Sequence, residues 1–340
     1  MTNASVRLVI TRQLPAWSRE RLAAVDPRLD LRYVPTRRDD YRIAATPKLK
    51  QYPSHEEVDT ELREAEILIG GLVQAFPERA PKLRWLQITS TGLNLADMPR
   101  LAKLAPEVRV ATAAGTHALA IAEWGILACL FFARGMPRAL ASRARREWDW
   151  FVATEVRGKT LGIVGLGNIG AATARLARAL GMRVIATRRS TTHRQHDVEG
   201  VDELLPAGQL LDLLRDSDYL YLSLPATPET DNLIGEEELR AMKPTAYLIN
   251  VARGQIVNEP ALLRALKEGW IAGAALDVFA KEPLPLENEI WELPNVFMTA
   301  HHAGTTDSFI PRLTDHLCEN LRRYLAGEPL LSQVDRALGY

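Results

Sequence analysis

Residues 158–170 read GKTLGIVGLGNIG and decide the fold. The apolar run 160–164 predicts a buried strand, and residues 171–180 predict a helix that is capped by Gly181. In the GxGxxG turn between them, Gly165 permits the tight bend, Gly167 lets the backbone approach a pyrophosphate, and Gly170 lets the helix pack close to the sheet. The helix N-terminus adds unpaired N–H groups that favour phosphate. This succession predicts a dinucleotide-binding unit; an ordinary glycine-rich turn is the alternative.

Short β-branched runs alternate with helical segments on both sides of this turn. Before it we expect a helix at 54–65, opened by the capping box Ser54-His55-Glu56-Glu57, and strands at 6–11, 29–34, 66–70, 84–89 and 108–111. After it we expect strands at 182–187, 219–223, 246–251, 271–278 and 296–299, and the longest helices at 116–134 and 307–326. Alternating strands and helices imply parallel strands joined by crossovers, so the fold class is α/β. Periodicity does not show which unit holds the last helix.

Composition excludes several classes of protein. A chain of 340 residues suggests about two domains. Its 42 basic and 42 acidic residues balance without a basic stripe, which argues against nucleic acid or an anionic membrane as the main partner. Cys129 and Cys318 lie in apolar helical patterns without metal-ligand spacing, so we expect reduced core residues and no metal site.

Neither a signal peptide nor a membrane span is expected. The N-terminal apolar run is too short for a signal-peptide core. The most apolar run, residues 118–133, carries Glu123 and falls short of the ~20 residues that a span needs. A buried or interfacial helix explains this run better, and we expect a cytoplasmic protein.

The end of the next strand distinguishes NAD from NADP. An NAD site places an acidic residue about 20 residues after the first glycine, where it binds the ribose 2′-OH. Here the strand ends in Thr187-Arg188-Arg189-Ser190, and the next acid along the chain is Asp197. Two guanidiniums and two hydroxyls suit a 2′-phosphate, which a carboxylate would repel. The sequence therefore predicts a preference for NADP(H), with NAD(H) left open; a solvated basic loop is the alternative.

Three ionisable residues follow consecutive predicted strands of the second unit: Arg253, Glu282 and His301. Ligands bind outside the carboxyl ends of parallel strands, so we expect all three in the ligand-binding cleft. Arginine can hold a carboxylate and polarise the neighbouring carbonyl, histidine can donate a proton to the developing alkoxide, and glutamate can hold the imidazole in its protonated form. Each alone is commonly a surface or structural residue. Their combination behind a nucleotide turn predicts hydride transfer on a 2-keto acid.

The chain resembles the D-isomer-specific 2-hydroxyacid dehydrogenase family over about residues 84–304. The resemblance rests on residues 158–170, on LPATPET at 224–230, NVARG at 250–254, ALDVF at 275–279, Glu282-Pro283 and HHAG at 301–304. It implies two doubly wound, Rossmann- or flavodoxin-like parallel-sheet domains with the active site in the cleft between them. Residues 1–112 and 305–340 would form the substrate domain, and residues 113–304 would form the inserted NAD(P)-binding domain.

The resemblance also assigns roles to residues. Arg253 binds the substrate, Glu282 and His301 form the acid–base pair, and the backbone N–H groups of Thr91 and Gly92 bind the substrate carboxylate. Asp277 meets the nicotinamide amide. The residues expected to bind the dinucleotide are Gly165, Gly167, Asn168, Ile169, Gly170, Thr187, Arg188, Arg189, Ser190, Leu224, Pro225, Thr230, Val251, Ala252, Asp277, His301 and Gly304.

Family members usually form homodimers through the coenzyme domain, including the helix that matches residues 116–134. The stripe of Leu119, Trp124, Leu127 and Phe131 suits such an interface. A helix buried within its own domain explains the stripe almost equally well.

The chain departs from the family pattern at two positions. Ala300 stands where the family usually has proline, and His302 where it has a nonpolar residue. Alignment on the following Ala303-Gly304 selects His301 rather than His302 as the acid. Relatives that oxidise formate carry glutamine beside the histidine, so Glu282 argues against that activity.

The function expected from these features is NADPH-preferring reduction of small 2-keto acids, such as glyoxylate or hydroxypyruvate, to D-2-hydroxy acids, with His301 as proton donor. Larger 2-keto acids stay open, because residues 41–52 and the patch Trp148–Trp150 would line a wider apolar pocket. One alternative is a phosphite-oxidising enzyme. Another is a dinucleotide-sensing interaction protein, like the co-repressor relatives; the intact Arg253, Glu282 and His301 argue against it.

Overall fold

The computed structural model describes residues 5–36, 52–93 and 97–336, and the chain divides into two compact units. The first unit comprises Met1–His117 and Thr305–Tyr340, and the second comprises Ala118–Gly304. The sequence predicts a boundary after residue 112, whereas the structure keeps residues 113–117 with the first unit. The reason is local bonding, since Ala113 N donates to Ser90 O and Ser332 Oγ donates to Ala114 O.

Within the described residues of the first unit, five parallel strands form one sheet in the order β2-β1-β3-β4-β5. The strands are β1 (Val6–Ile10), β2 (Leu29–Tyr33), β3 (Ile67–Ile69), β4 (Trp85–Gln87) and β5 (Arg109–Ala111). The helices are α1 (Ala16–Ala23), α2 (His55–Arg63), α3 (Met98–Leu101) and α10 (Phe309–Ala326), with the 3₁₀ turn η2 (Leu72–Ala75). The predicted capping box of α2 is confirmed, with Ser54 and Glu57 each bonded to the other's backbone N–H. This strand order is that of a flavodoxin-like sheet.

Helix α10 belongs to the first unit, which periodicity alone did not show. Ser18 Oγ on α1 lies 2.7 Å from Thr314 Oγ1 on α10, inside the core. Leu313 and Leu317 of α10 are fully buried in one cluster with Leu8 of β1. The last helix therefore completes the core of a sheet whose strands lie at the other end of the chain.

The second unit is a doubly wound sheet in the order β13-β12-β11-β10-β6-β7-β9-β8, in which only β8 is antiparallel among the described strands. Its strands are β6 (Thr160–Val164), β7 (Arg183–Arg188), β8 (Gln195–Val198), β9 (Val201–Pro206), β10 (Tyr219–Leu222), β11 (Tyr247–Asn250), β12 (Gly273–Leu276) and β13 (Val296–Met298). Its helices are α4 (Ala118–Ala133), α5 (Met136–Arg145), α6 (Asn168–Ala179), α7 (Leu210–Asp216), α8 (Glu236–Ala241) and α9 (Glu259–Glu268), with 3₁₀ turns η4 (Ala207–Gln209), η5 (Gly254–Ile256) and η6 (Glu289–Glu292). Two α/β units with parallel sheets confirm the predicted fold class.

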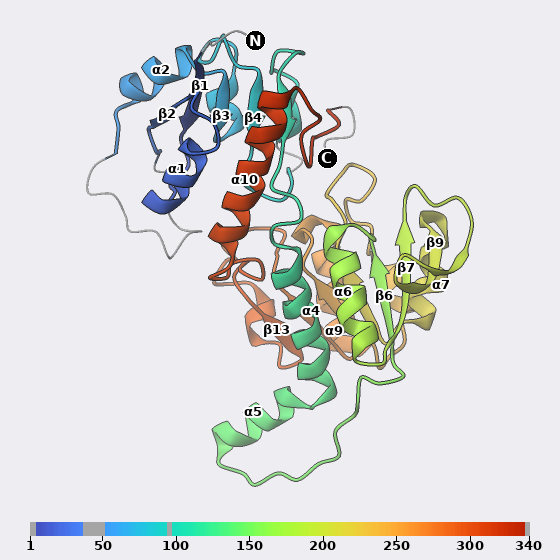
Figure 1. Ribbon diagram of the computed structural model, residues 1–340. Coiled ribbons are helices and arrows are strands. Elements are labelled where there is room, and N and C mark those ends of the chain that lie inside the picture. Colours follow the sequence, from blue (N-terminus) through green and yellow to red (C-terminus); the bar gives the residue numbers. More distant parts are fainter. Residues whose placement is uncertain (1–4, 37–51, 94–96, 337–340) are drawn as a thin grey trace. The chain divides into compact units, whose positions relative to one another are not determined.

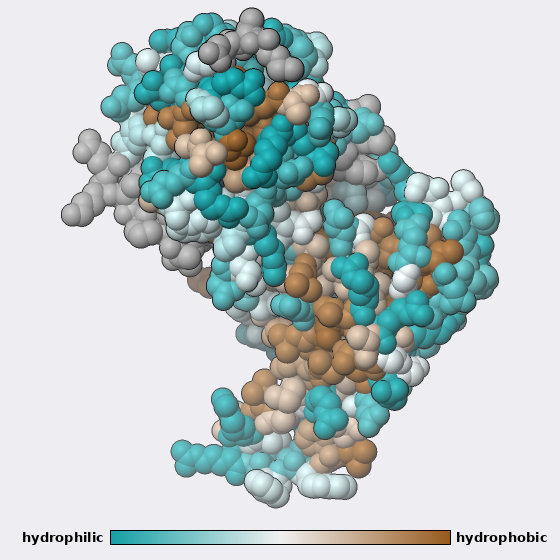
Figure 2. Space-filling model, viewed as in Figure 1, coloured by the Kyte–Doolittle hydropathy of each residue, from teal (hydrophilic) through white to brown (hydrophobic). Residues whose placement is uncertain are grey.

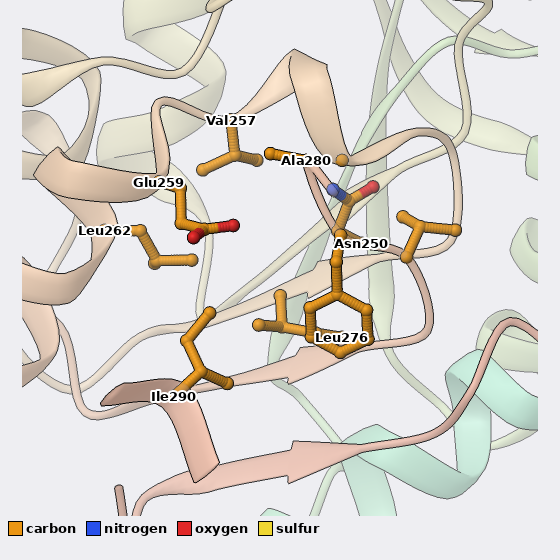
Figure 3. Close-up of a pocket in the computed structure, with 10 residues that line it drawn as sticks. Asn250, Val257, Glu259, Leu262, Leu276, Ala280 and Ile290 are labelled. Atoms are coloured by element: carbon orange, nitrogen blue, oxygen red, sulfur yellow. The ribbon is translucent and has the colours of Figure 1, made fainter. Parts of the chain in front are cut away.

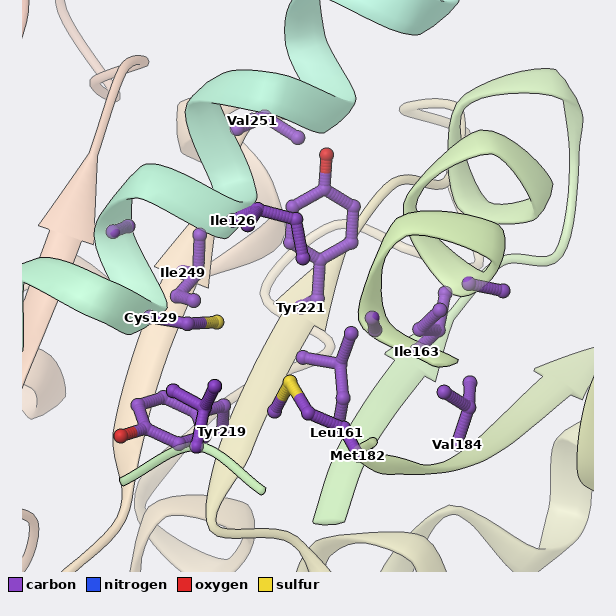
Figure 4. Packing of buried hydrophobic residues seen from close by; sticks show 14 of the residues in the cluster. Ile126, Cys129, Leu161, Ile163, Met182, Val184, Tyr219, Tyr221, Ile249 and Val251 are labelled. Carbon is purple, nitrogen blue, oxygen red and sulfur yellow. The ribbon is translucent and has the colours of Figure 1, made fainter. Parts of the chain in front are cut away.

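Helix α4 packs across the sheet of the second unit (Figure 4). Ile126 and Cys129 of α4 face Tyr221 and Ile249 on the strands. The contact is close at Gly125, where a Cβ atom would lie 2.4 Å from the Tyr221 ring. Cys129 is buried and free, as predicted, and burial raises the pKa of its thiol. Cys318 on α10 is likewise buried and free.

Helix α5 and the extended segment after it project away from the rest of the second unit (Figure 1). Large apolar side chains are exposed on α4, on α5 and on the segment after α5: Leu119, Leu127, Met136, Leu140, Trp148, Trp150 and Val152. In Figure 2 hydrophobic residues gather over the region of α4. Within the described ranges no single helix is long and apolar enough to cross a bilayer; α4 and α5 reach that measure only together, with a bend of 64° between them.

Candidate active site

The GxGxxG turn joins β6 to α6 with the geometry that its glycines predict. Gly165 has a φ of +99°, and a Cβ atom there would lie 3.0 Å from the Leu224 backbone. A Cβ atom at Gly170 would lie 2.5 Å from the carbonyl oxygen of Gly165. Gly181 caps the helix in the left-handed region, as expected. The first and third glycines are therefore required by the protein's own packing.

Gly167 is different, because packing does not require a glycine there. A Cβ atom at Gly167 would meet nothing within 4 Å, and its φ of −98° suits any residue. It is the N-cap residue of α6, and no side chain caps the helix. The open space in front of uncapped N–H groups fits a pyrophosphate. Asn168 and Ile169 form the first turn of the same helix.

The end of β7 differs from the sequence-based expectation in one important respect. The Arg188 guanidinium forms a bidentate ion pair with Glu199, at 2.6 and 2.8 Å. Glu199 comes from the β8–β9 hairpin, which was not predicted from sequence. The sequence shows no acid between Thr187 and Ser190, but the fold brings the carboxylate of Glu199 to Arg188. Thr187 is buried, and its carbonyl oxygen accepts from Gly165 N and Leu166 N.

Other polar groups surround this strand end. Arg189 and Ser190 are exposed. The charge of Arg189 helps to lower the pKa of Glu229, although a hydrogen bond with Thr227 is the larger cause. Three buried side-chain atoms lack a hydrogen-bond partner here, which suits a site for a polar ligand: Arg188 Nε, Thr191 Oγ1 and Gln209 Oε1.

The loop at 224–230 lies against the glycine turn. Ser223 Oγ donates to the carbonyl oxygen of Gly165 at 2.9 Å. Within the loop, Thr230 Oγ1 accepts from Thr227 N and donates to Pro225 O, both at 2.8 Å. The Thr230 hydroxyl is thus used to shape the loop that carries Leu224 and Pro225.

Asn250 fixes the turn that carries Arg253 at the end of β11. Its side chain accepts from Ala252 N and donates to Arg253 O, both at 3.0 Å. The next residue, Gly254, touches the loop after β12, because a Cβ atom there would lie 1.8 Å from the carbonyl carbon of Phe279. Val251 and Ala252 are buried, and Arg253 is half-buried. Asn250 therefore positions the backbone of Arg253. It is part of the NVARG motif at 250–254, but the sequence alone did not show this role.

The structure pairs His301 with Glu282. Nδ1 of His301 lies 2.7 Å from Oε2 of Glu282, while Oε1 of Glu282 accepts from Phe279 N at 3.1 Å. The two side chains are 31% and 30% exposed, so the pair is partly shielded yet open to a ligand. His302 is exposed and contributes its backbone N–H to Asp277 instead. The histidine on the glutamate is the one that the sequence selects.

Asp277 organises the loop that holds His301. Its carboxylate accepts from Thr299 Oγ1 at 2.5 Å, from His302 N at 2.9 Å and from Ala303 N at 3.1 Å. These bonds support a backbone in which His301 has a φ of +53°, a region that costs a non-glycine residue about 1–3 kcal/mol. Burial raises the pKa of Asp277, and the three hydrogen bonds oppose that rise. The expected contact of Asp277 with the nicotinamide stays a prediction.

A small cavity lies beside Asn250, at the end of β11 (Figure 3). Asn250, Gly254, Leu276 and Phe279 contribute to its walls, and Glu259 closes one side. Its volume of about 10 Å³ leaves room for roughly one water molecule. It is therefore too small to be the substrate site.

The remaining predicted residues lie at other places along the chain. Thr91 and Gly92 follow β4 in the first unit, where Ser90 Oγ donates to Gly92 O at 3.0 Å. Gly304 ends the second unit. Trp148 and Trp150 are almost fully exposed beyond α5, and residues 41–51 lie outside the described ranges. Among the described residues no cluster of His, Cys, Asp or Glu has the arrangement of a metal site.

Comparison with known proteins agrees with this arrangement. The family model for the NAD binding domain of D-isomer specific 2-hydroxyacid dehydrogenases matches residues 126–303. A glyoxylate reductase of Korarchaeum cryptofilum is 36% identical over 291 residues, which cover 81% of this chain and 84% of that protein.

Solved structures extend the match to nearly the whole chain. A D-isomer specific 2-hydroxyacid dehydrogenase family protein from Aeromonas salmonicida has a TM-score of 0.80 and 28% identity, and the match covers 98% of this chain and 100% of that one. A D-isomer specific 2-hydroxyacid dehydrogenase from Xanthobacter autotrophicus, in complex with NADPH and MES, has the same TM-score and identity over 99% and 100%. The doubly wound sheet, the glycine turn and the His–Glu pair agree with these matches. The chain belongs to the D-isomer specific 2-hydroxyacid dehydrogenase family of NAD(P)-dependent oxidoreductases.

Proposed function

We propose that the protein reduces small 2-keto acids, such as glyoxylate or hydroxypyruvate, to D-2-hydroxy acids with a preference for NADPH. The 2.7 Å contact between His301 and Glu282 carries the proposal. The loops that hold Arg253, Glu282 and His301 follow β11, β12 and β13, which are neighbours in the sheet. The relative named glyoxylate reductase supports the substrate class.

Each of the three side chains has a distinct task in this proposal. Glu282 holds Nδ1 of His301, so that Nε2 of the ring donates the proton to the substrate's carbonyl oxygen. Arg253 binds the substrate carboxylate and polarises the adjacent carbonyl. When bound, NADPH supplies the hydride that the carbonyl carbon receives. One proton and one hydride convert the keto acid into the hydroxy acid.

The cofactor preference rests on the arginines at the end of β7. Arg188 and Arg189 offer positive charge where the ribose 2′-phosphate of NADPH would lie in a Rossmann-type site. The Xanthobacter autotrophicus relative, which holds NADPH, supports this assignment. The buried atoms without partners beside Arg188 fit the same ligand.

The test is a panel of 2-keto acids assayed with the purified protein and NADPH or NADH. We expect turnover of glyoxylate or hydroxypyruvate and a higher kcat/KM with NADPH. His301→Ala should abolish most turnover, and His302→Ala should retain it. Tight cofactor binding without turnover of any acid would instead favour a dinucleotide sensor, and turnover of phosphite alone would favour the phosphite-oxidising alternative.

We also propose that the protein is a homodimer through α4. Trp124 and Phe131 pack within the second unit, where their rings lie 5.4 and 4.7 Å from that of Phe297. Leu119 and Leu127 are 41% and 50% exposed on the same helix. The predicted stripe thus divides between core and surface, and its exposed half suits a second copy of the chain.

A further inference from the structure

We propose that Glu199 sets the balance between NADPH and NADH by competing with the 2′-phosphate for Arg188. The inference rests on the proposed function, in which Arg188 recognises that phosphate. It assigns a role in cofactor specificity to Glu199, which lies eleven residues after Arg188 in the turn between β8 and β9.

Glu199 lies at the sharp reversal between β8 and β9. Glu199 and Gly200 form the turn, with φ values of +52° and +79°, and Val198 pairs with Val201 across it. Strand β9 then runs parallel to β7. Glu199 is thus an acid on the hairpin next to β7, and its carboxylate meets the guanidinium of Arg188.

The ion pair occupies the part of Arg188 that a phosphate needs. Both terminal nitrogens of the guanidinium bind the Glu199 carboxylate, at 2.6 and 2.8 Å. A phosphate monoester accepts the same planar, two-nitrogen contact. Glu199 therefore has to leave Arg188, at least in part, before the 2′-phosphate binds, and it repels the phosphate until it does.

The exposure of the pair makes this exchange feasible. The Arg188 side chain is 33% exposed and that of Glu199 is 50% exposed, so the carboxylate can turn into solvent. Hydrogen bonds from Arg188 also lower the pKa of Glu199, which keeps the competing group ionised. NADH has no 2′-phosphate and leaves the pair intact. The ion pair therefore weakens the binding of NADPH but not that of NADH. The preference for NADPH over NADH is then smaller than two unpaired arginines would give.

The full-length protein carries the test, with calorimetric titration of 2′,5′-ADP and 5′-AMP as probes that differ in the 2′-phosphate. Glu199→Gln should bind 2′,5′-ADP about three- to tenfold more tightly than the wild type, as expected for losing a partly exposed bidentate pair. Its affinity for 5′-AMP should not change. Asp197→Asn is the matched control, because it removes one charge from the same hairpin at an exposed position and asparagine tolerates the left-handed φ.

Arg188→Gln separates this inference from the function on which it rests. If Arg188→Gln abolishes the advantage of 2′,5′-ADP while Glu199→Gln leaves it unchanged or weakens it, the inference is overturned and the proposed NADPH site stands. If Arg188→Gln has no effect, both are overturned. When Arg188→Gln is already present, adding Glu199→Gln should not change the affinity for 2′,5′-ADP any further. The guanidinium for which Glu199 and the phosphate compete is then absent. If Asp197→Asn and Glu199→Gln raise the affinity for 2′,5′-ADP equally, the cause is the loss of one negative charge near the site rather than the loss of the ion pair. That result would also overturn the inference.

Discussion

Replacing Glu282 by glutamine tests the acid–base pair with little disturbance to its loop. Glutamine keeps the length of the side chain, and its carbonyl oxygen can still accept from Phe279 N, now 3.1 Å from Glu282 Oε1. What is lost is the negative charge 2.7 Å from Nδ1 of His301. The variant therefore isolates the effect of charge on the imidazole.

The size of the effect follows from the type of bond. A hydrogen bond between charged groups is worth about 1.5–3 kcal/mol and a neutral one about 0.5–1.5 kcal/mol, so the change costs the protonated ring roughly 1–1.5 kcal/mol. That free energy corresponds to about a tenfold change in rate. Because Glu282 holds Nδ1 of His301, glutamine in its place should slow proton donation by the ring by about this factor.

The assay is kcat/KM for glyoxylate reduction with NADPH at one fixed pH. We expect Glu282→Gln to lower kcat/KM about tenfold. Glu287→Gln, a charge change at an exposed position of the same loop, should leave kcat/KM unchanged. Equal kcat/KM values for the wild type and Glu282→Gln would refute the pairing as a contribution to proton donation.

Three further outcomes are expected. Gly170→Ala, whose Cβ would lie 2.5 Å from a carbonyl oxygen, should lose about 1–3 kcal/mol of stability in scanning calorimetry. Gly167→Ala should melt like the wild type, but in fluorescence titrations it should bind NADPH about tenfold or more weakly. Burial lowers the pKa of His316, so as the pH falls the unfolded chain is protonated before the folded one. The free energy of unfolding should therefore decrease below the ordinary histidine pKa, and urea titrations should show a smaller decrease for His316→Gln. Leu127→Glu should halve the mass seen by sedimentation, whereas Leu286→Glu, also an exposed leucine, should not; equal masses for all would contradict the dimer.

Local patterns predicted the central elements well. The strand–turn–helix at β6 and α6 depends on glycines and apolar residues that are adjacent in sequence, and the capping box of α2 spans four consecutive residues. The pairing of His301 with Glu282 followed from their positions after neighbouring strands. In each case the physics that fixes the geometry lies within a short segment or within the order of the strands.

The features that sequence did not predict depend on long-range contacts. Strand β8 is short and polar, and the hairpin that it forms with β9 carries Glu199 to Arg188. A rule that counts residues along the chain does not register an acid that arrives from another strand. Helix α4 is apolar on all sides, so its periodicity did not separate the buried Trp124 from the exposed Leu127.

The first unit is built from both ends of the chain, and this has a consequence for biosynthesis. Its sheet is translated early, but Leu313, Leu317 and Leu321, which complete one of its cores, are translated only after the whole second unit. A nascent chain that has reached Gly304 holds every described strand of both sheets and still leaves that apolar face uncovered. Ribosome-bound intermediates of this length should therefore recruit holdase chaperones, and they should release them once α10 emerges from the exit tunnel.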